Sequence, residues 1–248
     1  MNLVSFIMSQ VNQLTKGGKR KIMGKGIFIT ATGTDVGKTY VTGLLVKKLR
    51  EAGLNAGYYK AALSGAEITP EGLLPGDADF VRRMAGLDVK PQELVSYIYE
   101  EAVSPHLAAL REGNPVELAK ISEDYAKSLE KYEYVTMEGS GGIICPIRWD
   151  EQHILLEDII KELNLGTLVI STAALGSINA CILTIFYLKE HDIPVRGIIL
   201  NNYDDNDFMQ VDNKKMIEAI GGVPILACVP PNADNLEIDV DLLTSLYK

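Results

Sequence analysis

Short apolar runs rich in β-branched residues alternate with helical stretches along most of this chain. Strands that alternate with helices of this length form crossover units, which place the strands parallel to one another in one sheet. The sequence therefore predicts an α/β fold of three layers, in which helices flank a mostly parallel, doubly wound sheet. We expect strands at residues 26–32, 55–61, 134–138, 167–171, 195–201 and 223–229, and helices at 38–52, 77–85, 115–131, 152–163, 177–191 and 212–220.

The chain divides into a short extension and one folded unit. Residues 1–25 combine a brief apolar stretch with a basic run from Lys16 to Lys25. A secretory signal has the opposite order, with the basic end first, so we interpret residues 1–25 as a disordered N-terminal extension. No repeat, low-complexity tract or linker interrupts residues 26–248, and we expect them to form a single catalytic domain.

The charge balance excludes two classes of partner. The chain has 24 Lys and Arg against 33 Asp and Glu, a formal net charge of −9, whereas general binding to nucleic acid or anionic membranes requires a basic surface. Residues 163–188 are uncharged and long enough to span a bilayer, but Gly166, Gly176 and Asn179 interrupt them. We expect a buried strand, a turn and a core helix there, and a cytoplasmic protein.

The segment from Gly33 to Thr39, Gly-Thr-Asp-Val-Gly-Lys-Thr, lies between the first expected strand and the first expected helix. Backbone N–H groups of such a loop and the positive N-terminus of the helix form an anion cradle. Lys38 would place a point charge on the β- and γ-phosphates, and Thr39 a hydroxyl on Mg²⁺. A simple Gly/Thr turn is the alternative, but Gly-Lys-Thr in this setting favours phosphate binding and a fold of the P-loop NTPase type.

Polar side chains also stand where other expected strands end, the edge at which open parallel sheets bind ligands. Lys60 and Ser64 follow the second strand, and Glu138 ends the strand at 134–138. A carboxylate beside a phosphate loop suits Mg²⁺, which prefers hard oxygen ligands. Lys60 could instead extend to solvent, and Asp77, at the start of a helix, could equally be an N-cap.

Together these motifs resemble the dethiobiotin synthetase family of P-loop NTPases. The resemblance covers residues 26–237. It rests on the loop at 30–39, Gly-Tyr-Tyr-Lys-Ala-Ala-Leu-Ser-Gly at 57–65, Thr-Pro-Glu-Gly-Leu-Leu-Pro-Gly-Asp-Ala at 69–78, Ser-Pro-His at 104–106, Glu-Gly-Ser-Gly-Gly at 138–142, Leu-Gly-Ser-Ile-Asn at 175–179 and Asn-Asn at 201–202.

The resemblance implies an ATP- and Mg²⁺-dependent ligase of biotin biosynthesis that forms C–N bonds. In this family 7,8-diaminononanoate takes up CO₂ as a carbamate, ATP phosphorylates the carbamate, and the second amine attacks the mixed anhydride. The products are dethiobiotin, ADP and phosphate. The resemblance also implies a homodimer whose active site is completed across the interface.

The resemblance assigns roles to individual residues. Lys60 corresponds to the family's catalytic lysine, with Lys38 of the phosphate loop beside it, and Thr39, Asp77 and Glu138 correspond to its Mg²⁺ ligands. The residues implied to contact ATP are Asp35, Val36, Gly37, Lys38, Thr39, Tyr40, Asp77, Glu138, Gly139, Ser140, Gly141, Asn201, Asn202, Pro230, Pro231, Asn232 and Glu237. Those implied to contact the substrate are Ser64 and, from the partner subunit, Gly176, Ser177 and Ile178.

Two other classes of P-loop protein provide alternatives. Amide-forming enzymes of the cobyrinate synthetase group also carry a glutamine-amidotransferase domain, for which 248 residues leave no room. Switch ATPases of the ParA and MinD kind usually have a second lysine early in the phosphate loop. This loop has Thr32, Gly33 and Thr34 there instead, and the chain is acidic.

Overall fold

The central sheet of this protein is fully parallel. The computed structural model describes residues 24–248, and its strands follow the order β11-β10-β9-β1-β6-β2-β5 with every neighbouring pair parallel. This arrangement confirms the predicted doubly wound sheet. The strands are β1 (Lys25–Ala31), β2 (Ala56–Leu63), β5 (Val95–Ile98), β6 (Tyr134–Glu138), β9 (Thr167–Ser171), β10 (Val195–Asn201) and β11 (Ile225–Val229).

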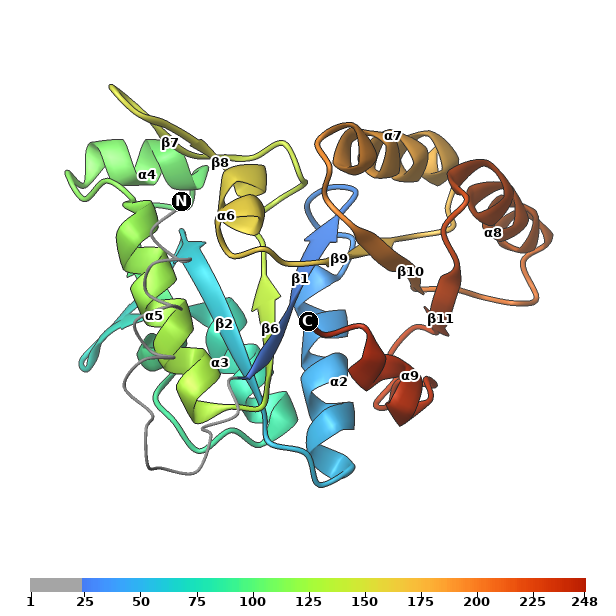
Figure 1. The fold of residues 1–248 in the computed structure, drawn as a ribbon, viewed down its shortest axis with the longest axis horizontal. Helices are drawn as coiled ribbons and strands as arrows, with labels where there is room; N and C mark the ends of the chain where they lie inside the picture. Colours follow the sequence, from blue (N-terminus) through green and yellow to red (C-terminus); the bar gives the residue numbers. More distant parts are fainter. Residues whose placement is uncertain (1–23) are drawn as a thin grey trace, which may run out of the picture.

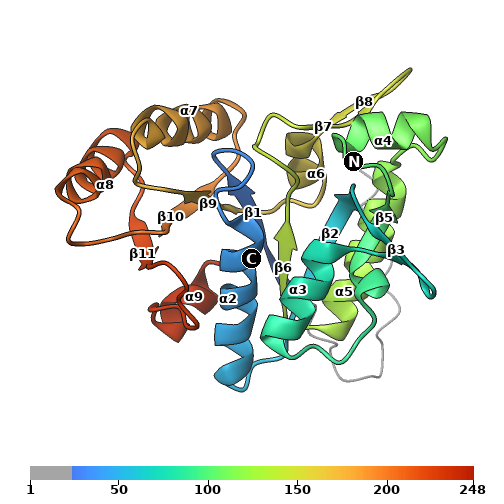
Figure 2. The same ribbon diagram turned by 180° about the vertical axis from the view of Figure 1, so that it is seen from behind.

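Helices cover both faces of the sheet (Figures 1 and 2). One face packs against α2 (Lys38–Glu51) and α3 (Gly76–Ala85), with α9 (Val240–Ser245) beside α2. The other face packs against α5 (Leu118–Lys131), α6 (Leu156–Glu162), α7 (Ser177–Glu190) and α8 (Phe208–Gly221). The crossovers run toward the β5 edge as far as β5 and toward the β11 edge after it. Right-handed crossovers in opposite directions place their helices on opposite faces, so the helices change face after β5. The three predicted layers are therefore confirmed.

The central strands are buried on both sides. All eight residues of β2 and all five of both β6 and β9 are buried. Continuous apolar strands of this kind are expected in parallel sheets, where helices exclude water from both faces. Lys60 and Glu138 are exceptions to the apolar pattern, since both are charged and almost completely buried.

Several local predictions differ from the structure. The helix expected at 152–163 begins only at Leu156, because His153–Leu155 (β8) pairs with Pro146–Trp149 (β7) in an antiparallel hairpin. The helix expected at 115–131 begins at Leu118. The edge strand β5 was not predicted. Other elements not predicted are the hairpin of β3 (Glu67–Thr69) and β4 (Gly72–Leu74), the 3₁₀ turn η1 (Pro91–Leu94), α4 (Pro105–Arg111) and α9.

The proposed N-terminal extension lies outside the described residues, apart from its last two. Lys25 begins β1, and the N–H of Gly24 donates to the carbonyl of Leu129. The uncharged stretch at 163–188 forms β9, a connecting loop and most of α7, as expected. Within residues 24–248, no helix combines the length and the apolar character that crossing a membrane would require.

Candidate active site

A cavity of about 1040 Å³ opens at the carboxyl ends of β1, β2 and β6. It extends from the phosphate loop to the segment that precedes α4. This is the edge at which the sequence placed the ligand site. The lining residues are Thr34, Asp35, Gly37, Lys38, Thr39, Tyr40, Lys60, Leu63, Ser64, Gly76, Asp77, Phe80, Ala102, Val103, Ser104, Pro105, Ser140, Gly141 and Cys145.

The phosphate loop ends at Gly37, directly before α2. Gly37 has a φ of 87°, and a Cβ there would lie 2.0 Å from the Nδ2 atom of Asn201. Only glycine fits this position without strain or collision. Asn201 Nδ2 donates to the carbonyl of Val36 at 3.0 Å, which joins the end of β10 to the loop. The N-terminus of α2 therefore faces the cavity with a backbone shape that suits a phosphate group.

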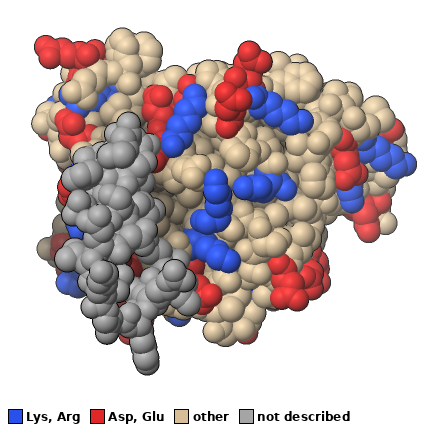
Figure 3. All heavy atoms as spheres, in the orientation of Figure 1, with Lys and Arg blue, Asp and Glu red and all other residues tan. Residues whose placement is uncertain are grey.

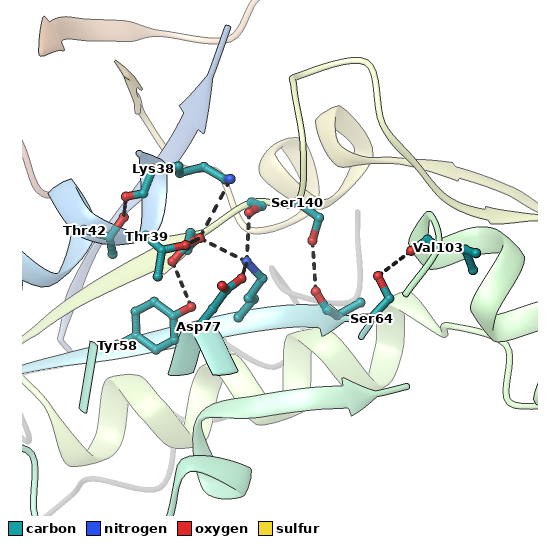
Figure 4. A network of polar contacts seen from close by, with 12 residues as sticks. Lys38, Thr39, Thr42, Tyr58, Ser64, Asp77, Val103 and Ser140 are labelled. Carbon is teal, nitrogen blue, oxygen red and sulfur yellow. Dashed lines mark hydrogen bonds and ion pairs between the residues drawn. The ribbon is translucent and has the colours of Figure 1, made fainter. Parts of the chain in front are cut away.

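A cluster of charged side chains lies beside this loop (Figure 4). Lys60 and Glu138 are direct neighbours in the paired strands β2 and β6, so their side chains lie on the same face of the sheet. The Lys60 Nζ is 3.0 Å from Glu138 Oε1 and 2.7 Å from Asp77 Oδ2. Lys38 Nζ lies 3.8 Å from Glu138 Oε1. Lys60 is 3% exposed, so it does not extend to solvent.

Asp77 comes from the first turn of α3 but does not cap that helix. The N-cap position is Pro75, and the helix has no side-chain cap hydrogen bond. The carboxylate of Asp77 instead accepts a hydrogen bond from the Lys60 ammonium. The interpretation of Asp77 as an N-cap is therefore wrong, and its side chain belongs to the charged cluster.

The opposing charges outweigh the effect of burial at Lys60. Burial alone would lower the pKa of Lys60, but attraction to Glu138 and Asp77 raises it above the ordinary value. Burial would raise the pKa of Asp77, and the nearby Lys60 ammonium lowers it below the ordinary value. At Lys38 burial dominates and lowers the pKa, because Glu138 lies further away. At neutral pH Lys60 and Asp77 are therefore both ionised.

Three oxygen donors converge in this cluster. The Thr39 hydroxyl donates to Glu138 Oε1 at 2.8 Å, and Lys60 joins that same oxygen to the carboxylate of Asp77. Hydroxyl and carboxylate oxygens are the hard ligands that Mg²⁺ prefers. Among the described residues no group of three or more His, Cys, Asp or Glu side chains could hold a metal. Two carboxylates and one hydroxyl could hold a cation only together with further ligands from phosphate and water.

Tyr58 belongs to the same cluster, although the sequence analysis did not identify it. Tyr58 lies two residues before Lys60 in β2, so both side chains lie on the same face of the sheet. Its hydroxyl donates to Glu138 Oε2 at 2.9 Å, and burial raises the pKa of Tyr58 well above the usual value. The alternation of side chains along the predicted strand was the available signal.

Ser64 and Ser140 also line the cavity. Ser64 Oγ donates to the carbonyl of Val103 at 2.5 Å, and Ser140 Oγ donates to the carbonyl of Ala62 at 2.9 Å. The first of these bonds joins the residue that follows β2 to the segment before α4. Of the predicted segment 139–141, Ser140 and Gly141 line the cavity, whereas the carbonyl of Gly139 accepts from Lys60 at 3.2 Å.

The residues predicted to contact the base do not line the cavity. Asn201 is 3% exposed, and its Oδ1 atom has no hydrogen-bond partner. Asn232 lines a neighbouring groove together with Tyr40, whose hydroxyl donates to the carbonyl of Ala233. Glu237 accepts a hydrogen bond from Asn235 and is exposed. Asn202, Pro230 and Pro231 are exposed at the ends of β10 and β11.

The predicted substrate residues at the start of α7 do not line the cavity. Gly176 has a φ of 88° and precedes the helix, which begins at Ser177. Ser177 is 7% exposed, and its Oγ has no hydrogen-bond partner. Ile178 is half-buried, and neighbouring Leu175 is 87% exposed. This end of α7 thus combines an unpaired buried hydroxyl with an exposed apolar side chain.

Charged side chains of both signs occur on the face of the molecule drawn in Figure 3. On the part of the face in Figure 3 that described residues form, basic and acidic side chains are interspersed among uncharged ones. Such a mixed surface differs from the continuous basic area with which proteins bind nucleic acid.

Comparison with known sequences identifies the relatives of this chain. A family model described as an AAA domain matches residues 25–237. An ATP-dependent dethiobiotin synthetase BioD of Clostridium botulinum (strain Eklund 17B / Type B) is 49% identical over 225 residues, which are 91% of this chain and 99% of the relative. A protein of the same description from strain Loch Maree / Type A3 is 47% identical over 226 residues, with the same coverage of both chains.

Solved structures of lower sequence identity share the fold. A ParA family ATPase from Chlorobium tepidum superposes with a TM-score of 0.52 at 16% identity, covering 89% of each chain. MinD in a MinC:MinD complex from Aquifex aeolicus gives a TM-score of 0.53 at 16% identity, covering 90% of this chain and 86% of that one. These similarities confirm a P-loop type of α/β fold.

Proposed function

Because this chain belongs to the dethiobiotin synthetase family, whose members are ATP-dependent ligases, we propose that it converts 7,8-diaminononanoate, CO₂ and ATP to dethiobiotin, ADP and phosphate. We propose Mg²⁺ as the metal, residues 26–248 as one catalytic domain and the cytoplasm as the location. The observation that supports this reaction most directly is the buried Lys60 ammonium, held 2.7 and 3.0 Å from two carboxylates at the edge of a phosphate loop.

The first step joins one substrate amine to CO₂, which forms a C–N bond and releases a proton. Ser64 borders the cavity near Lys60 and would contact the substrate there. The resulting carbamate is an anion, and the Lys60 ammonium is a cation placed to stabilise it. Carbamate oxygens would compete with Asp77 and Glu138 for this ammonium, so Lys60 would act as a catalytic residue.

In the second step a carbamate oxygen attacks the γ-phosphorus of ATP, and the bond to the ADP oxygen breaks. Lys38 and the N–H groups of the loop from Asp35 to Tyr40 would hold the β- and γ-phosphates. Thr39, Asp77 and Glu138 would hold Mg²⁺, which would neutralise charge on the phosphate oxygens. Asn201, Asn202, Pro230–Asn232 and Glu237 would bind the base. This step gives the carbamic-phosphoric mixed anhydride.

Ring closure follows when the second amine attacks the carbonyl carbon of the anhydride. The new C–N bond closes the ureido ring, phosphate leaves with the electron pair, and the amine loses a proton. Lys60 and Lys38 would stabilise the departing phosphate. Cys145 and the segment from Ala102 to Pro105 complete the wall of the cavity around the reacting groups.

We propose a homodimer in which the start of α7 receives the substrate carboxylate of the partner's site. Two features support this: Gly176, Ser177 and Ile178 lie outside this chain's own cavity, and the buried Ser177 hydroxyl has no partner. The apolar side chains Leu183 and Phe186 of α7 are also exposed, at 59% and 51%. A second copy packed against α7 would cover them.

A direct assay tests this function. The protein is incubated with diaminononanoate, ¹³C-bicarbonate, Mg²⁺ and ATP. The products are then separated by chromatography, and the mass of each is measured by mass spectrometry. We expect dethiobiotin carrying one ¹³C atom, with one ADP formed per ring. Lys120→Met, which changes an exposed lysine on α5, is the control and should match the wild type. Hydrolysis of ATP without labelled dethiobiotin would contradict the proposal.

A further inference from the structure

Tyr58 is a buried polar residue to which the proposed reaction assigns no role. It is completely buried in β2 at the same level as Thr136 of β6. Its hydroxyl reaches diagonally along the sheet to Glu138, which stands two residues beyond Thr136, and donates to the Oε2 atom at 2.9 Å. The buried Tyr58 hydroxyl therefore donates its hydrogen bond to one specific carboxylate oxygen, Oε2 of Glu138.

The two oxygens of Glu138 therefore have separate partners. Oε1 accepts from the Thr39 hydroxyl at 2.8 Å and from the Lys60 ammonium at 3.0 Å, and lies 3.8 Å from Lys38. All three of these residues line the cavity. Oε2 accepts from Tyr58, which does not line it. Only Oε1 is directed toward the groups that would surround a bound nucleotide.

This division bears on which cation the site accepts. Mg²⁺ requires near-ideal octahedral geometry at about 2.0–2.1 Å, which suits one oxygen from each carboxylate. Ca²⁺ takes about 6–8 ligands at 2.3–2.6 Å and readily accepts both oxygens of a carboxylate. For Glu138 to bind through both oxygens, its carboxylate would have to rotate and give up the Tyr58 hydrogen bond. Burial of Tyr58 opposes this rotation, because it would leave the hydroxyl without a partner.

We propose that Tyr58 is a positioning residue that restricts Glu138 to a single metal-binding oxygen, Oε1, and thereby makes the site discriminate against Ca²⁺ in favour of Mg²⁺. This inference rests on the proposed function, which assigns Mg²⁺ to Thr39, Asp77 and Glu138. It adds a reason why the site would select Mg²⁺ over Ca²⁺. Removing a side chain that hydrogen-bonds to a metal ligand commonly lowers metal affinity by about 10–100-fold.

The test compares Tyr58→Phe with Tyr59→Phe. Both tyrosines are buried in β2 and both hydroxyls are hydrogen-bonded, but Tyr59 lies on the opposite face, where its hydroxyl contacts Ser96 Oγ at 2.6 Å and the carbonyl of Ile121 at 3.2 Å. Mn²⁺ bound in the presence of a non-hydrolysable ATP analogue is followed by electron paramagnetic resonance. Mg²⁺ or Ca²⁺ is then added to displace it, which gives the ratio of their affinities without any turnover.

In Tyr58→Phe we expect the preference for Mg²⁺ over Ca²⁺ to fall about tenfold, mainly through tighter Ca²⁺ binding, because Glu138 becomes free to bind through both oxygens. In Tyr59→Phe we expect the ratio to stay within about twofold of the wild type, since the Glu138 carboxylate keeps its partners. An unchanged ratio in Tyr58→Phe, while the wild type binds Mn²⁺, would overturn the role of Tyr58 and leave the proposed function intact. Failure of the wild type to bind Mn²⁺ with the nucleotide would overturn the metal assignment itself.

A second measurement does not depend on how well a variant folds. A crystal structure of the wild-type protein with Mn²⁺ and the ATP analogue should show Glu138 bound through Oε1 alone, with Oε2 still accepting from Tyr58. Coordination through both oxygens of Glu138 would refute the proposal.

Discussion

Replacement of Lys60 by methionine provides the sharpest test of the charged cluster. The substitution keeps a long side chain but removes the ammonium that joins Asp77 to the fully buried Glu138 side chain. Breaking a buried ion pair by removing one partner costs about 3–5 kcal/mol, because a charge stays buried without compensation. The lower end applies here, since Lys38 remains 3.8 Å from Glu138 and the Asp77 side chain is 41% exposed. We therefore expect a loss of about 3 kcal/mol in the free energy of unfolding.

This loss can be measured by calorimetry. For a domain of about 150–250 residues each kcal/mol shifts the melting temperature by about 2–4 °C, so Lys60→Met should melt about 6–12 °C below the wild type. Lys120→Met is the matched control, because Lys120 pairs with Asp124 at 2.6 Å but is 47% exposed. An exposed pair is worth less than about 1 kcal/mol. Equal melting temperatures for the two variants would refute the reasoning.

The pH dependence follows from the two pKa shifts. The pKa of Lys60 is raised, so its stabilising effect is complete below 10.5 and is lost as the pH rises through the higher value in the folded state. The pKa of Asp77 is lowered, so its effect is complete above 3.8 and is lost as the pH falls through the lower folded-state value. The stabilising contribution of these two groups in the wild type should therefore stay constant between about pH 5 and 9.

Three further predictions concern metal, nucleotide and subunit binding. Asp77→Asn should raise the Mg²⁺ concentration for half-maximal turnover by about tenfold, and an unchanged Mg²⁺ titration would exclude Asp77 as a ligand. Burial lowers the pKa of Lys38, so the affinity for ADP, measured by calorimetry, should decline before the pH reaches 10.5. Constant affinity up to that pH would contradict the role of the Lys38 ammonium in phosphate binding. Leu183→Glu should give a monomer by light scattering if α7 lies in the dimer interface; an unchanged dimer would place the interface elsewhere.

The fold was largely predictable because alternation and a single loop motif constrain it strongly. Strand–helix alternation and the Gly-Lys-Thr at 37–39 indicated a parallel sheet with a phosphate site at its carboxyl edge. The short edge strand Val95–Ile98 was missed, since four residues give too little periodicity to distinguish a strand from a loop. Residues 153–155 were predicted to be helical. Their pairing with Pro146–Trp149 in a short antiparallel hairpin leaves no periodic pattern of apolar residues in the sequence.

The sequence could predict which charged residues stand at the strand ends of the site, but not how they contact one another. Lys60 and Glu138 follow from the rule that parallel strands end at one edge, but only the register makes them direct neighbours. Sequence alone left Asp77 between capping and ligand binding, because both roles place a carboxylate in the first turn of a helix. Alternation along β2 places Tyr58 on the same face of the sheet as Lys60, but which carboxylate oxygen its hydroxyl reaches depends on distances that no sequence pattern contains.

The pairing of Lys60 with Glu138 in adjacent strands has a consequence for engineering this sheet. Their separation is fixed by the main-chain ladder between β2 and β6, so the segments at 64–75 and 99–104 can change length without moving either charge. Inserting one residue within β2 ahead of Lys60 would instead turn the ammonium to the opposite side of the sheet. Libraries aimed at new substrates should therefore diversify those segments and leave the length of β2 untouched.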